Sequence, residues 1–81
     1  MNKTAQDLQN LINTLAMQIS ALESQLAYVK GEIERKDIPE GLKNDWITER
    51  DRIIGVINQK VIEGETASRL LDAYDDPANN V

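Results

Sequence analysis

Apolar residues recur along the first half of the chain at alternating intervals of four and three residues. The series comprises Leu8, Ile12, Leu15, Ile19, Leu22, Leu26, Val29 and Ile33. This spacing is typical of the a and d positions of a heptad repeat, and no proline interrupts it. It predicts a helix over residues 4–36, roughly 45 to 50 Å long at 1.5 Å per residue. A helix of this length needs a partner helix to cover its apolar face.

A turn at residues 37–41 is predicted to separate this helix from a second one. Pro39 disfavours helical geometry at Ile38 and suits the first turn of a new helix. The second helix is expected over residues 39–63, with Gly64 as its C-terminal stop. Its apolar side comprises Leu42, Trp46, Ile47, Ile53, Ile54, Ile57 and Val61. The cluster of β-branched residues there would also suit a strand. A helix is preferred because the neighbouring polar residues recur at helical spacing on the side opposite the apolar residues.

A short third helix is predicted over residues 66–74, with Thr66 as its cap and Leu70, Leu71 and Tyr74 on its apolar side. Residues 75–81 are polar and are expected to form a flexible acidic tail. The fold class is therefore all-α. We expect one domain over residues 1–74, a coiled-coil-like helix–turn–helix hairpin that assembles into a helical bundle.

The first predicted helix carries no charge between Leu8 and Leu22. If the second helix ends at Gly64, the first turns of the first helix extend beyond it and stay exposed. We therefore predict a homo-oligomer interface there, made of Leu8, Leu11, Ile12, Leu15, Ile19 and Leu22. Ile at a and Leu at d favour two strands, which predicts a homodimer, with a trimer as the alternative. The competing interpretation is an amide-rich face that stays in water.

The sequence offers few residues that could take part in catalysis or metal binding. The chain has no His and no Cys, which removes the commonest general base, thiolate nucleophiles and the usual zinc ligands. Asp72, Asp75 and Asp76 offer oxygen ligands, but their spacing does not match an EF-hand loop, and a solvated acidic tail is the preferred interpretation. We expect no enzyme activity, no cofactor and no metal site.

The 81 residues include 14 acidic and 9 basic side chains, for a net charge of −5. This balance disfavours binding to nucleic acid and to anionic membranes. No apolar run is long enough to cross a bilayer, and the first residues do not resemble a signal peptide. We therefore expect a soluble cytoplasmic protein.

Trp46 and Arg50 are the candidate partner-binding residues of the second helix. Trp46 would either fill the core near the turn or anchor an interface. Arg50 falls on the apolar face, with Glu23 of the first helix within reach, or it extends to solvent.

These features predict a non-enzymatic oligomerisation or adaptor protein that binds itself and an unidentified protein partner. In general build, from its first residue to Gly64, the chain resembles small dimeric helical-hairpin proteins and the short coiled-coil accessory proteins of bacteriophages. The alternative is a small acidic inhibitor that binds a basic surface of a target protein, for which the net charge of −5 is the support.

Overall fold

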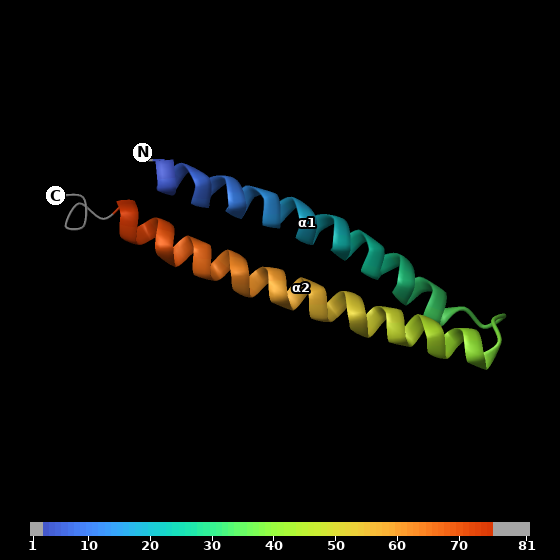
Figure 1. Cartoon of the computed structure of the whole chain (residues 1–81). Coiled ribbons are helices and arrows are strands. Elements are labelled where there is room, and N and C mark those ends of the chain that lie inside the picture. Colours follow the sequence, from blue (N-terminus) through green and yellow to red (C-terminus); the bar gives the residue numbers. More distant parts are fainter. Residues whose placement is uncertain (1–2, 76–81) are drawn as a thin grey trace.

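The computed structural model describes residues 3–75, which form two helices joined by a short turn. Helix α1 spans Lys3–Glu34 and helix α2 spans Glu40–Asp75. The two helices run antiparallel, side by side along their whole length, so that Lys3 and Asp75 lie at the same end (Figure 1). The hairpin measures 63 × 14 × 14 Å. The predicted all-α hairpin is confirmed.

Helix α1 follows the heptad pattern of its sequence. Ala5, Leu15 and Val29 are buried, and the other a and d residues of the series are half-buried against α2. The helix ends two residues earlier than predicted, where the Arg35 amide donates to the Glu32 carbonyl at 3.2 Å. The a and d side chains of α1 therefore form one wall of the contact with α2, which we call the seam.

The turn lies where the proline places it. The Pro39 carbonyl accepts a hydrogen bond from the Lys43 amide at 3.0 Å, the first bond of α2. Pro39 has no amide proton to leave unpaired, and its fixed φ angle suits the start of a helix. Helix α2 accordingly begins at Glu40, one residue later than predicted.

The prediction of a third helix is wrong, because α2 continues through Gly64 and Thr66 to Asp75. The seam residues of α2 continue the alternation of four and three residues past the glycine. They are Trp46, Arg50, Ile53, Ile57, Lys60, Gly64, Ala67 and Leu71, all buried or half-buried. A glycine inside a helix costs about 1 kcal/mol. Burial of Ala67 and Leu71 beyond it offsets that cost, so the glycine does not end the helix.

The length of α2 also corrects the expected overhang of α1. A Cβ atom on Gly64 would lie 4.0 Å from Leu15 Cδ1, so Gly64 is level with Leu15. The last three turns of α2 then cover the start of α1, where Ala5 is 2% exposed. Of the predicted acidic tail, residues 76–81 lie outside the described residues, and Asp75 is the last residue of α2.

The core is a single row of aliphatic side chains between the helices. Its fully buried members are Ala5, Leu15, Val29, Ile53, Ala67 and Leu71. Among residues 3–75 no polar or charged side chain is fully buried. Neither described helix is long and apolar enough to span a membrane.

Candidate interaction surfaces

The first predicted surface, the strip of six residues on α1, is largely occupied by α2. Leu15 is 4% exposed, and Leu8, Ile12, Ile19 and Leu22 are half-buried in the seam. Only Leu11, which lies beside the seam, is clearly exposed, at 44%. The premise of an uncovered strip is wrong, because α2 continues beyond Gly64 as far as Asp75.

Leu11 belongs to a groove between the two helices near their termini. This terminal groove has a volume of about 380 Å³. Its lining residues are Leu8, Leu11, Gln59, Ile62, Glu63, Thr66, Ala67 and Leu70. Glu63 is its one charged member, so the groove offers a mainly apolar surface beside the seam.

Trp46 lies near the turn and packs against α1. Its ring meets that of Tyr28 edge to face, with the centroids 5.9 Å apart and the planes at 79°. Edge-to-face pairs of this kind add to the energy of simple burial. The two rings line a second groove, the aromatic groove, with Ser24, Gln25, Val29, Glu49 and Ile53. Trp46 is half-buried, so it closes the core near the turn and also presents an edge to this groove.

Arg50 is half-buried in the seam, as its place on the apolar face predicted. The carboxylate that it binds is Asp51 of its own helix. Arg50 Nε donates to Asp51 Oδ1 at 3.0 Å, and Nη2 lies at the same distance from that oxygen. Glu23, the partner considered from the sequence, does not take this role in the described part of the chain.

A second cation of the seam bridges the two helices. Lys60 Nζ donates to Gln18 Oε1 at 2.9 Å, joining residues 42 positions apart in sequence. The long aliphatic stem of a lysine can lie along the seam while its ammonium reaches a polar partner at the edge. The bond fixes Lys60 level with Gln18 and so marks the register of the hairpin.

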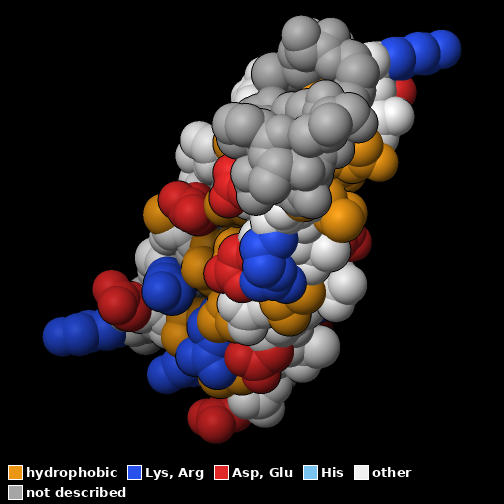
Figure 2. Space-filling model, turned by 90° about the vertical axis from the view of Figure 1, so that its left-hand side faces the viewer, with side chains coloured by type: hydrophobic (Ala, Val, Ile, Leu, Met, Phe, Trp, Pro, Cys, Tyr) orange, Lys and Arg blue, Asp and Glu red, His pale blue; other side chains and the backbone are white. Residues whose placement is uncertain are grey.

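Helix α2 carries a further row of aliphatic residues outside the seam. Ile47, Ile54 and Val61 recur every seven residues and form what we call the outer stripe. Ile54 is 36% exposed and Val61 39%, whereas Ile47 is half-buried. None of these three lines either groove, and helical periodicity turns them toward the opposite flank of the hairpin. Hydrophobic side chains accordingly reach the surface on both flanks when the hairpin is seen from its terminal end (Figure 2).

The sequence contained the signal for the outer stripe. The apolar side predicted for the second helix includes all three residues, but the sequence pattern does not separate them from the residues that pack on α1. A helix with apolar residues at a, d and e is typical of bundles, where it contacts more than one neighbour.

Charged side chains pair locally rather than across the helices. Arg52 Nε donates to Glu49 Oε2 at 3.0 Å, and the two residues are three positions apart on the same helix, where side chains are neighbours. This hydrogen bond raises the pKa of Arg52 and lowers that of Glu49. These groups are exposed, so each pair contributes little to the stability of the fold.

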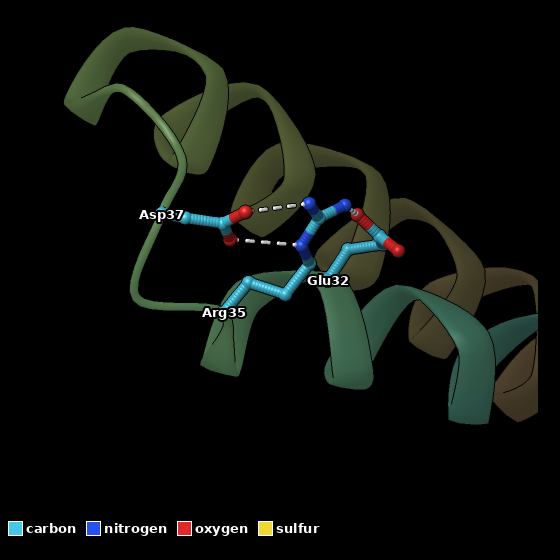
Figure 3. Close-up of polar contacts among 3 residues, drawn as sticks. All are labelled: Glu32, Arg35 and Asp37. Carbon is cyan, nitrogen blue, oxygen red and sulfur yellow. Dashed lines mark hydrogen bonds and ion pairs between the residues drawn. The ribbon is translucent and has the colours of Figure 1, made fainter.

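Arg35 holds the start of the turn. Its Nε and Nη2 atoms donate to the two carboxylate oxygens of Asp37 at 3.1 and 2.9 Å, and Nη1 donates to Glu32 at 3.0 Å (Figure 3). Hydrogen bonding to Asp37, and then to Glu32, raises the pKa of Arg35. The Arg35 side chain in turn lowers the pKa of Asp37, with a smaller contribution from the Asp37 backbone.

This geometry predicts an acid-sensitive turn. The pKa of Asp37 in the fold lies below the ordinary value of an aspartate, so the pair stabilises the fold fully above that ordinary value and is lost as the pH falls through the folded pKa. We expect an NMR titration to give Asp37 a pKa below that of an unpaired aspartate, and Arg35→Gln to raise it toward the ordinary value. An ordinary pKa for Asp37 in the unmodified protein would contradict the pairing.

Metal and cofactor chemistry finds no support in the described residues. Among the described side chains, those of residues 3–74, no group of three or more from His, Cys, Asp or Glu is arranged to hold a metal ion. Asp76, a member of the acidic cluster considered from the sequence, lies outside that range. Comparison with protein-family models, with curated proteins and with solved structures found no significant match.

Proposed function

We propose that this protein is a non-enzymatic helical assembly or adaptor protein that acts through protein–protein contacts as a homodimer. The observation that carries the proposal is the apolar surface that the two helices leave uncovered. Large exposed side chains flank the seam on both sides and include Leu11, Ile54, Val61, Ile62 and Leu70. Two packed helices form one thin layer, and a second layer would cover one of these flanks.

The uncharged part of α1 supports the same proposal. Between Leu8 and Leu22 its outward positions carry amides, small residues and Met17, which is 74% exposed. Outward positions of a helix covered on one side only usually carry Glu and Lys. Each aliphatic side chain that a second chain fully buried would contribute roughly 1.5 to 3 kcal/mol, so several together can offset the entropy of association.

The acidic-inhibitor alternative has less support. Carboxylates of the turn and of α2 pair with neighbouring arginines at Arg35, Arg50 and Arg52, which reduces the negative field available to a basic target. The proposal extends to an unidentified protein partner, and it places the protein in the cytoplasm, with which its lack of Cys is compatible. An accessory role of the kind found in bacteriophages remains part of the same proposal.

Sedimentation equilibrium on the full chain tests the homodimer. At micromolar concentration we expect twice the chain mass of 9.1 kDa. The melting temperature should also rise with protein concentration, because association stabilises the folded state by mass action. Three times the chain mass would replace the dimer by a trimer and keep the assembly role. A monomer whose melting temperature does not depend on concentration would overturn the proposal.

A further inference from the structure

We infer that the outer stripe is the surface on which a second copy of this chain docks, with the two α2 helices antiparallel and Ile54 on the two-fold axis. The inference rests on the proposed homodimer and specifies its interface. A closed dimer uses the same patch on both copies, so the patch must complement itself under a two-fold rotation. The outer stripe meets this condition.

The aliphatic residues of the stripe are symmetric about Ile54. Ile47 lies seven residues before it and Val61 seven residues after it. In an antiparallel pair centred on Ile54, Ile47 of one copy meets Val61 of the second copy, and the two Ile54 side chains meet each other. Shifting the register by one heptad would lose one aliphatic match, because a stripe of three residues then overlaps only at two positions.

Polar groups on the edges of the stripe also match in this register. Asp51 comes close to Asn58 of the second copy, whose amide can donate to the carboxylate. Lys43 and Glu65 are equally far from Ile54 along the chain, one before it and one after it, so each comes level with the opposite charge on the second copy. Neither Lys43 nor Glu65 forms an ion pair within residues 3–75, so both charges are available.

The other closed arrangement of two such layers places α2 of one copy over α1 of the second. The hydrogen bond between Gln18 and Lys60 fixes which parts of the two helices are level. At that register Ile54 would be level with Ser24 of the second copy and Ile47 with Gly31, so each would lie one residue from a charged side chain, Glu23 or Lys30. Covering aliphatic side chains with charged ones forfeits their burial and desolvates the charges. The antiparallel α2 pair avoids both costs.

The antiparallel pair does bring Glu23 of the two copies level with each other on α1. Glu23 is exposed, and two exposed carboxylates can diverge into solvent, where their repulsion is screened. Repulsion between them would weaken the dimer without changing its orientation.

Single cysteines test the orientation directly, because the chain has no Cys of its own. We expect Ile54→Cys to form a disulfide-linked dimer on mild oxidation. Ile47→Cys and Val61→Cys should not link to themselves, because copies of the same residue would then lie roughly 20 Å apart at 1.5 Å per residue. A mixture of these two variants should give the mixed disulfide.

The results separate this inference from the proposed function. If the unmodified chain is a dimer but Ile54→Cys forms no disulfide, the interface assigned here is wrong and the homodimer stands. A disulfide between Ile54→Cys and Glu23→Cys chains would establish the α2-over-α1 arrangement instead. If the unmodified chain is a monomer, both ideas fail.

A matched pair of charge variants measures the contribution of the stripe. Ile54→Glu should raise the dimer dissociation constant at least tenfold, because a carboxylate at the two-fold axis would face its own copy. Gln59→Glu adds the same charge on the opposite flank, beside the terminal groove, and should leave the constant within about threefold of the original. Equal effects of the two variants, with helicity retained in both, would overturn the inference.

Discussion

Ile53→Ala is expected to destabilise this protein more than any other single truncation to alanine. Ile53 is 1% exposed, the lowest value in the described core, and lies near the middle of the seam. Truncating a fully buried Ile to Ala typically costs about 2 to 5 kcal/mol, because contacts are lost and a cavity remains. A core one row wide has little other buried area to compensate. The midpoint of thermal unfolding, followed by circular dichroism, should fall by at least about 10 °C.

Met17→Ala is the control for this prediction. Met17 is 74% exposed on the outward side of α1, and its truncation should change stability by no more than about 0.5 kcal/mol. Both variants must be measured at one protein concentration, since the proposed dimerisation would contribute to stability. A loss at Ile53 no larger than that at Met17 would show that the seam is not the core.

Glu65→Pro is expected to lower stability by about 3 kcal/mol or more, because residue 65 lies inside a continuous helix. A proline there removes the amide that donates to the Val61 carbonyl and clashes with that carbonyl. The break predicted from the sequence would instead place residue 65 in a loop, where a proline is tolerated. Chemical denaturation monitored by helicity distinguishes the two structures.

Glu40→Pro provides the matching control at the first residue of the same helix. The amide of a residue in the first helical turn has no intrahelical acceptor, so a proline there costs far less. We expect Glu40→Pro to retain near-normal stability. If Glu65→Pro is as stable as Glu40→Pro, α2 is interrupted near Gly64.

The fold could be predicted as far as local signals determined it. The a and d series of α1 and the restriction imposed by Pro39 are local, and both predicted the structure to within two residues. The position at which α2 ends is not determined by local sequence signals. Whether the helix continues past Gly64 depends on burial of Ala67 and Leu71 against α1, which the glycine alone does not reveal.

For the candidate surfaces too, features set by one helix could be predicted, whereas features set by contacts between the helices could not. The partial burial of Arg50 follows from spacing along one helix, and the sequence predicted its place on the apolar face. The register between the two helices determines which aliphatic side chains are covered and which remain exposed. Once α2 extended over the start of α1, the strip from Leu8 to Leu22 became part of the core contact. The uncovered aliphatic residues were then those beside the seam, the outer stripe among them.

Both helices place their outer ends, Lys3 and Asp75, at the same end of the hairpin (Figure 1). A domain fused near either residue would extend from that end of the hairpin. The turn would lie at the opposite end, at most 63 Å away. In the proposed antiparallel dimer the two shared ends would point in opposite directions. The assembly would then serve as a rigid double-ended spacer, holding two attached groups roughly 60 Å apart at 1.5 Å per residue.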